Sequence, residues 1–215
     1  MQNIQLDHSS HRAGAEKFPV CFLAHDIDGP YNIGSLFRIA DALGVEKIYL
    51  TGKTVTPPNK KLKKTARSTE KYVSYSCEPD PFEVVKKLRN RGYAIVSLEI
   101  TSASIDIKSF NIAGHEKICL IIGSENDGIC QELLDASDAT IHIPMFGVNS
   151  SMNLAGACAI ATYEITTKYR LQNNLIRKTE APGAPRNNNQ NAQTTRPSHQ
   201  ESTNKFNHLP GAEVK

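Results

Sequence analysis

The sequence predicts an α/β fold in which helices cover both faces of a mostly parallel sheet. Apolar runs such as VCFLA and ICLII are continuous rather than alternating, which is typical of strands buried on both faces. Between them lie segments whose apolar residues recur every three or four positions, as in helices that pack on a sheet. With 215 residues and 39% hydrophobic content, the chain is long enough for one domain with its own core.

The expected elements follow one another in a regular order. The first strand is predicted at FPVCFLAH, residues 18–25, and a turn with Gly29 and Pro30 follows it. A helix is expected from Asn32 because its apolar residues share one face, and Gly44 ends it. Further strands are predicted over residues 46–50, 71–75, 93–99, 117–123 and 140–144. Further helices are predicted over residues 79–90 and 129–137. A final helix begins within the 139–161 stretch and runs to about Leu171.

Both ends of the chain are polar. We expect a flexible arm over residues 1–17, a globular domain over residues 18–172 and a disordered tail over residues 179–215. The tail is rich in Asn, Gln, Thr and Pro, so it cannot bury enough apolar surface to offset the entropy cost of ordering. The first residues carry no apolar signal core, and no apolar run approaches the roughly 20 residues that span a bilayer. A cytoplasmic protein without a membrane segment is expected.

The cysteines give no sign of a metal site or a disulfide framework. Five are scattered without a CxxC pair, at Cys21, Cys77, Cys119, Cys130 and Cys158, mostly within apolar runs. We therefore interpret them as reduced core residues.

Basic residues gather in one long, proline-interrupted loop between Lys53 and Lys71. They are opposed there only by Glu70, and they comprise Lys60, Lys61, Lys63, Lys64 and Arg67. Mobile cations in such a loop could meet a polyanion, so these five residues are candidates for nucleic-acid binding. A second basic group near the end of the next helix, from Lys86 to Arg91, is interpreted as a solvated face.

Three strand-to-helix segments could carry chemistry. In the first, NIGSLFR at residues 32–38, Asn32 is expected to cap the helix and Arg38 lies on a rigid element. Arg38 is either a surface arginine with a buried stem or an anchor for a phosphate or a developing oxyanion. The second, GSENDG at residues 123–128, is neither a dinucleotide fingerprint nor a Walker loop. Glu125 in it is a helix-start acid or a site residue.

The third segment, residues 139–161, begins as a strand and ends as a helix. The loop between them bears Pro144, Gly147 and Ser151, and Asn153 is expected on the first helical turn. Such a loop is either a small-ligand site or a plain capped helix start. Serine hydrolase chemistry is disfavoured, because the nearby His142 lies within a strand and no elbow surrounds Ser151.

Together these segments resemble the three ordered motifs of the SpoU/TrmH family, RNA ribose 2'-O-methyltransferases of the SPOUT class. The matching patterns are N-x-G-x-x-x-R at residues 32–38, G-x-E-x-x-G at residues 123–128 and I-P-M-x-G-x-x-x-S-x-N at residues 143–153. The resemblance covers about residues 18–169. It implies the SPOUT fold with a C-terminal trefoil knot, a homodimer, and S-adenosylmethionine as the cofactor.

The resemblance also assigns a role to each site residue. It implies that Arg38 is the central catalytic residue and that Asn32, Glu125, Ser151 and Asn153 shape its pocket. The methyl donor would be held by the main chain around Leu98, Gly123, Ile143, Ser151 and Met152. Two positions depart from the usual pattern: Ala155 stands where a small polar residue is common, and Met152 where leucine is common.

The resemblance favours transfer RNA as the substrate. Larger relatives that modify ribosomal RNA carry a separate N-terminal RNA-binding domain, whereas about 17 polar residues precede the first strand here. Alternatives are the same reaction on ribosomal RNA and a non-catalytic RNA-binding protein that retains the fold. A nicotinamide oxidoreductase is disfavoured because its phosphate-binding fingerprint is absent.

Overall fold

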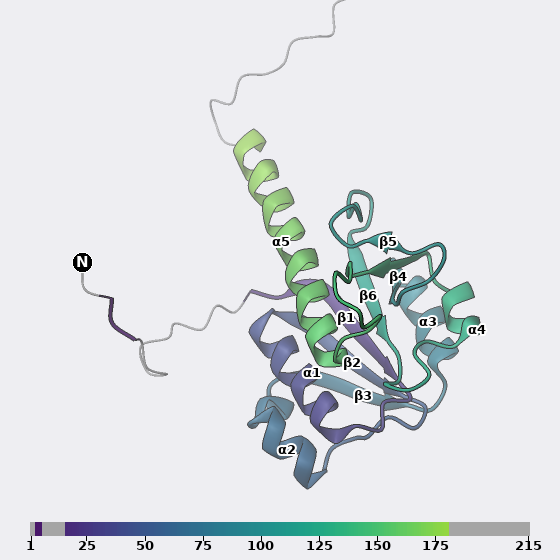
Figure 1. Cartoon of the computed structure of the whole chain (residues 1–215). Coiled ribbons are helices and arrows are strands. Elements are labelled where there is room, and N and C mark those ends of the chain that lie inside the picture. Colours follow the sequence, from purple (N-terminus) through teal and green to yellow (C-terminus); the bar gives the residue numbers. More distant parts are fainter. Residues whose placement is uncertain (1–2, 6–15, 181–215) are drawn as a thin grey trace, which may run out of the picture.

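The computed structural model describes residues 3–5 and 16–180 and contains one seven-stranded sheet (Figure 1). All strand pairs are parallel, and the strand order is β3-β2-β1-β6-β4-β7-β5. The strands are β1 (Phe18–His25), β2 (Val45–Thr51), β3 (Ser74–Glu78), β4 (Tyr93–Leu98), β5 (Ile105–Asp106), β6 (Lys117–Ile122) and β7 (Ala139–His142). The helices are α1 (Pro30–Ala42), α2 (Lys60–Ala66), α3 (Pro81–Arg89), α4 (Gln131–Asp135) and α5 (Leu154–Glu180), with a short 3₁₀ helix at Thr69–Lys71.

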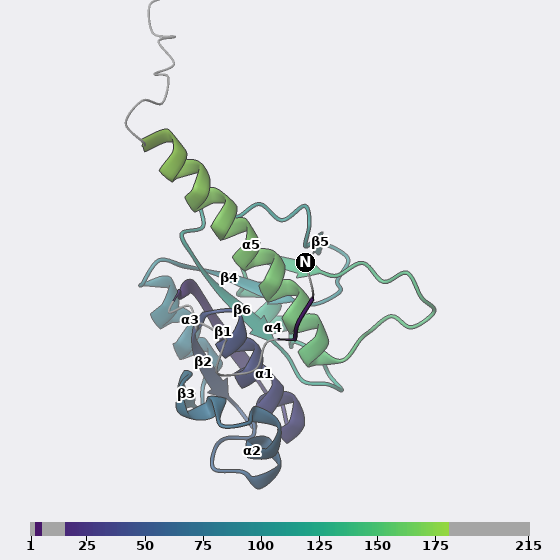
Figure 2. The ribbon, with the colours of Figure 1, turned by 90° about the vertical axis from the view of Figure 1, so that its left-hand side faces the viewer.

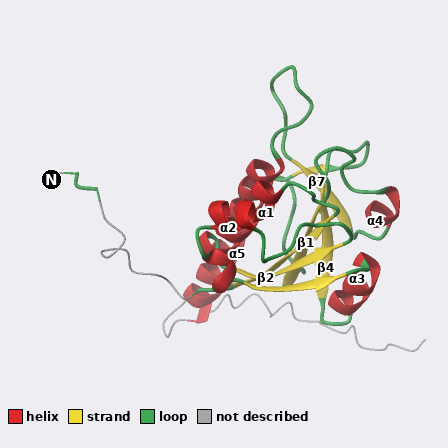
Figure 3. Cartoon of the chain, turned by 90° about the horizontal axis from the view of Figure 1, so that it is seen from below, coloured by secondary structure: helices red, strands yellow, loops and turns green. Residues whose placement is uncertain are grey.

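Helices cover the sheet on both faces, as predicted (Figure 3). Side chains of β1 alternate between the two layers: Val20 and Phe22 enter one apolar cluster, and Cys21 and Leu23 enter the other. The first cluster contains residues of α1, α2 and α5, and the second contains residues of α3 and α4. The central strands are therefore buried on both sides, which explains their continuous apolar runs.

The segment between β2 and β3 differs from the predicted loop, because it contains the helix α2. Asn59 caps this helix by accepting hydrogen bonds from the main-chain N–H groups of Lys61 and Leu62, at 2.9 and 3.1 Å. Leu62 and Ala66 are buried, so the helix packs through two apolar residues one turn apart. A β carbon on Gly34 of α1 would come within 2.6 Å of the Leu62 carbonyl oxygen, so glycine permits the close approach of α1 and α2.

Other element boundaries also depart from the expectations. The strand predicted over residues 71–75 lies at Ser74–Glu78, after the 3₁₀ helix, and β5 was not predicted because two residues carry no periodicity. Helix α5 continues past the expected Leu171 to Glu180, so it crosses the predicted domain boundary at 172 and enters the predicted tail (Figure 2). Most of the predicted arm and the tail beyond residue 180 lie outside the described residues.

Helix α5 is tied to the connection between β5 and β6. The Lys168 ammonium donates to the main-chain oxygens of Ile107, Lys108 and Phe110, at 2.6, 3.1 and 2.8 Å. In the sheet, β7 lies between β4 and β5, which both precede it in the chain. The last strand, β7, is therefore inserted between β4 and β5, and α5 follows it in the chain. The trefoil knot stays a prediction.

The cysteines are partly as predicted. Cys21, Cys119 and Cys158 are buried and free, and burial raises the pKa of the Cys158 thiol to about 12. Cys77 and Cys130 are exposed, so the prediction that the cysteines are core residues is wrong for these two. Over residues 3–5 and 16–180, no helix is both long and apolar enough to cross a membrane.

Candidate active site

A cavity of about 800 Å³ lies at the edge of the sheet where β4, β6 and β7 end. Parallel strands bring their carboxyl ends to the same edge, which is where open α/β sheets bind ligands. The loops that follow β6 and β7 supply most of the wall. Among the lining residues are seven that the sequence singled out: Leu98, Gly123, Glu125, Ile143, Ser151, Met152 and Asn153.

Three segments far apart in the sequence meet beside this cavity through their side chains. The Asn32 amide nitrogen donates to the Glu125 carboxylate at 2.5 Å, and the Asn153 amide nitrogen donates to the Asn32 oxygen at 3.1 Å. The asparagine of the first segment therefore joins the loop after β6 to the start of α5. The predicted convergence of Asn32, Glu125 and Asn153 is present in the structure.

The helix cap that the sequence predicted for Asn32 is made instead by Asn153, at the start of another helix. Asn32 was expected to cap α1, but Gly29 occupies the N-cap and Pro30 opens the helix. The Asn32 side chain is thus free to turn toward Glu125. Asn153, which was expected on the first helical turn, instead precedes α5, and its side-chain oxygen accepts from the N–H groups of Ala155 and Gly156, at 3.0 and 3.2 Å.

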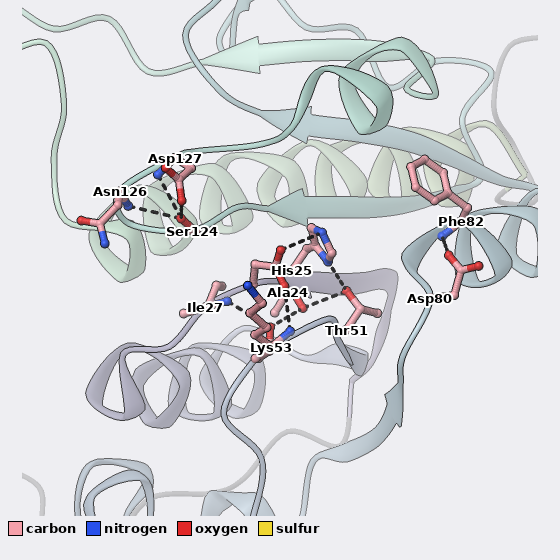
Figure 4. Close-up of polar contacts among 12 residues, drawn as sticks. Ala24, His25, Ile27, Thr51, Lys53, Asp80, Phe82, Ser124, Asn126 and Asp127 are labelled. Atoms are coloured by element: carbon pink, nitrogen blue, oxygen red, sulfur yellow. Dashed lines mark hydrogen bonds and ion pairs between the residues drawn. The ribbon is translucent and has the colours of Figure 1, made fainter.

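Glu125 is presented by a tight turn between Gly123 and Gly128. Ser124 and Gly128 exchange two main-chain hydrogen bonds, and the Ser124 hydroxyl accepts from the N–H groups of Asn126 and Asp127 (Figure 4). A β carbon on Gly123 would overlap the Gly128 carbonyl, and one on Gly29 would overlap the Glu125 carboxylate. Glycine at position 123 therefore lets the backbone turn close, and glycine at position 29 leaves the Glu125 carboxylate undisplaced.

A second polar cluster holds the turn that leads into α1. Asp26 has a left-handed backbone with φ 54°, and its carboxylate accepts from the main-chain N–H of Lys53 at 2.7 Å. The His25 ring lies 3.3 Å from that carboxylate and 3.0 Å from the Thr51 hydroxyl (Figure 4). These contacts fix the turn that places Gly29 against Glu125. The sequence offered no signal for this supporting role.

Arg38 lies apart from the cavity. It is exposed on α1 and borders a separate groove between α1 and α5, where Ala159 and Tyr163 also lie. It is absent from the residues that line the cavity. The structure of one chain therefore does not bring the predicted catalytic arginine to the predicted cofactor loops.

The charged side chains in the cavity wall are acidic. They are Glu99, Glu125 and Asp127, and the wall contains no lysine or arginine. Glu99 was not predicted as a site residue, although it directly follows a buried strand at the same sheet edge as Glu125. Its carboxylate accepts from the N–H of Ile129 at 3.3 Å. This arrangement favours a cationic or neutral ligand over a phosphate. Within the described ranges, no group of three His, Cys, Asp or Glu residues could hold a metal ion.

The fold and cavity define an α/β protein that holds a small ligand at the carboxyl edge of a parallel sheet. The chain belongs to the SpoU rRNA methylase family, which matches residues 19–163. The predicted family and the predicted class of enzyme, an RNA methyltransferase, are confirmed.

Named relatives and solved structures agree with this assignment. A tRNA (guanosine(18)-2'-O)-methyltransferase from Thermus thermophilus is 27% identical over 66% of this chain and 71% of its own length. The Escherichia coli enzyme of that name is also 27% identical, over 63% of this chain, but the match spans only 57% of that enzyme. The structure of AviRb from Streptomyces viridochromogenes, a SpoU methyltransferase in complex with AdoMet, has a TM-score of 0.66 and 26% identity and covers 80% of this chain and 67% of its own.

Substitutions that swap the hydrogen-bond donor and acceptor between positions 32 and 125 test whether the contact between Asn32 and Glu125 supports activity. Asn32→Asp removes the donor and sets two carboxylates against each other, so we expect methyl transfer to RNA to fall by about 10²-fold through misplaced site groups. The double variant Asn32→Asp/Glu125→Gln reverses the donor and the acceptor, and it should recover most of the activity.

Glu125→Gln alone is the matched control, because it keeps an oxygen that accepts from Asn32. Each variant is compared with wild type by methyl-transfer rate and by melting temperature. A double variant as inactive as Asn32→Asp, at unchanged melting temperature, would contradict a positioning role for this hydrogen bond.

Proposed function

We propose that this protein transfers a methyl group from S-adenosylmethionine to a ribose 2'-hydroxyl of transfer RNA. The observation that carries the proposal is the hydrogen-bonded chain Glu125–Asn32–Asn153 at the mouth of an acidic, ligand-sized cavity. The T. thermophilus and E. coli relatives are both named as 2'-O-methyltransferases of tRNA, which favours tRNA over ribosomal RNA as the substrate. An RNA substrate also supports a cytoplasmic location.

The cavity residues fit the proposed cofactor. A volume of about 800 Å³ lies in the range for small-ligand sites. S-adenosylmethionine carries positive charge on its sulfonium and amino groups, and the acidic wall complements both. When bound, it supplies an electrophilic methyl group. Residues with main-chain or apolar atoms on the cavity would hold it, namely Leu98, Gly123, Ile143, Ser151 and Met152.

The protein's own contribution to the reaction is alignment and charge stabilisation. Asn32, Glu125 and Asn153 hold the three loops in one geometry, so that the 2'-oxygen can approach the methyl carbon in line. The hydroxyl must lose a proton, but a guanidinium stays protonated in proteins. Arg38 therefore binds an RNA phosphate and stabilises the developing alkoxide, while phosphate or water accepts the proton.

Arg38 reaches the reaction in our proposal because two copies of the chain form a homodimer. It follows Asn32 by six residues, which places it about 9 Å further along α1 and on a different face of the helix. The face of α5 beside it exposes Ile160, Tyr163 and Leu171, at 43%, 63% and 59%. A second copy that covered these apolar side chains would set its own cavity beside Arg38.

Methyl acceptance by defined RNAs tests the reaction and the substrate. We expect the purified protein to transfer labelled methyl groups from S-adenosylmethionine to a ribose 2'-oxygen of tRNA and not to ribosomal RNA. Arg38→Lys should lower the rate by 10-fold or more, because a point charge replaces a two-pronged donor. The product is mapped by alkaline hydrolysis, which 2'-O-methylation blocks. Base methylation, or exclusive labelling of ribosomal RNA, would contradict the proposal.

Mixed dimers test whether Arg38 acts across the subunit boundary. Arg38→Ala and Asn32→Asp chains are each expected to be nearly inactive alone. Co-expressed in equal amounts, they should regain about a quarter of wild-type activity, since half of the dimers have one complete site. No recovery in mixed dimers isolated through two different tags would place Arg38 and Asn32 in the same site of one chain.

We also propose that α2 binds the RNA backbone. Its residues Lys60, Lys61, Lys63 and Lys64, together with Arg67 at its C-cap, are all exposed. Leu62 and Ala66 fix the helix on α1, which also bears Arg38. The cations are therefore held on a rigid element rather than a mobile loop, and they would contact phosphates without reading sequence.

Neutralising part of α2 should weaken RNA binding and its salt dependence. For Lys63→Gln/Lys64→Gln, the slope of log affinity against log salt should become shallower by about 2. The control is Lys86→Gln/Lys87→Gln on α3, which covers the opposite face of the sheet. Filter binding of tRNA across a salt series measures both. Equal slopes for the two double variants would assign the RNA contacts elsewhere.

A further inference from the structure

One histidine in the cavity wall has no role in the reaction described above. His142 is the last residue of β7, and its side chain lines the cavity. Its ring nitrogen Nδ1 is buried and has no hydrogen-bond partner. Two other side-chain atoms share this property within the described ranges, on Glu70 and Ser76, but neither residue lines the cavity. Because Nδ1 is buried, the ring nitrogen left to contact a group in the cavity is Nε2, which is not among the buried unpaired atoms.

The position of Nδ1 determines which form of the ring is favoured. A hydrogen on Nδ1 would be buried without an acceptor, so the ring hydrogen is favoured on Nε2. His142 is therefore suited to donate one hydrogen bond through Nε2–H. The matching ligand group is an acceptor.

The sheet places His142 away from the hydrogen-bonded chain of the active site. Glu125 follows β6, and His142 ends β7, with β4 between the two strands. Two strand spacings amount to about 10 Å. His142 therefore faces one end of an elongated ligand whose reacting centre lies near Glu125.

The surroundings of His142 distinguish the two ends of such a ligand. Ile129 and Leu134, from the segment around α4, line the same cavity and belong to the apolar layer on that side of the sheet. Along β7, side chains alternate, so Ile141 enters the opposite layer and His142 points toward the layer of α4. An apolar wall with one donor suits a flat heteroaromatic base with ring-nitrogen acceptors better than a charged amino-acid tail.

We propose that His142 is a specificity residue that hydrogen-bonds the adenine base of the bound methyl donor. This inference rests on the proposed function, because it takes the cavity ligand to be S-adenosylmethionine. The imidazole then selects a purine nucleoside, and the acidic residues near the Glu125 turn face the sulfonium and amino groups of the ligand.

Binding of ligand fragments to matched variants tests the inference. His142→Phe keeps a flat ring but removes the donor, and Thr140→Val is the control, because Thr140 lies on the same face of β7 without lining the cavity. Calorimetry with S-adenosylhomocysteine and with adenosine should show about 10-fold weaker binding of both to His142→Phe. His142→Gln, which retains an N–H donor, should recover part of the loss, and Thr140→Val should bind as wild type does. In the methyl-transfer assay, the effect of His142→Phe should fall mainly on KM for the donor.

The outcomes separate this inference from the proposed function. If wild type binds both nucleosides and His142→Phe binds them within twofold of wild type, the role of His142 is wrong and the proposed function stands. If His142→Phe weakens S-adenosylhomocysteine but not adenosine, the contact is to the amino-acid tail and the assignment to adenine is overturned. If wild type binds neither nucleoside, the proposed function itself fails.

Discussion

The arrangement of the active site depends on the side-chain amide of Asn32. An amide offers a donor and an acceptor a little over 2 Å apart, and here each is used toward a different loop. The donor meets Glu125, 93 residues away, and the acceptor meets the Asn153 amide, 121 residues away. A carboxylate could not donate and an ammonium could not accept, so neither could make both contacts from this position.

The parallel sheet makes such a contact possible between distant segments. β1 and β6 are neighbours in register from Val20 to Ala24, so the turns after both strands emerge side by side. Close backbone approach then completes the site. Gly29 leaves room for the Glu125 carboxylate, and Gly123 leaves room for the returning Gly128 carbonyl. A larger residue at Gly29 would displace the carboxylate that Asn32 contacts, and one at Gly123 would open the turn that presents it.

Much of this organisation could be predicted from the sequence, and the failures have physical reasons. Continuous apolar runs specify buried parallel strands, and residues just after them specify one sheet edge, so Glu125 and the loop before Asn153 were placed correctly. The apolar helical pattern that follows Asn32 predicts a cap there, but Pro30 already fixes the start of α1 two residues earlier. Helix α2 was not predicted because only two apolar residues, Leu62 and Ala66, mark its buried face, and two residues among lysines give too weak a helical periodicity. Arg38 could not be placed, because the face it occupies depends on what packs against α1 and α5.

The separation of charge fits the proposal that the methyl donor and the RNA bind to different surfaces. The cavity wall carries Glu99, Glu125 and Asp127, which would attract a sulfonium compound and repel a phosphodiester. Exposed cations lie instead on α1 and α2, outside the cavity, at Arg38 and from Lys60 to Arg67. In the function that we propose, the polyanion is held back from the acidic wall, and only a neutral ribose hydroxyl has to enter the region between them. A site of this kind gains from an arginine on a separate element, because a guanidinium inside the cavity would pair with Glu125 and break the contact with Asn32.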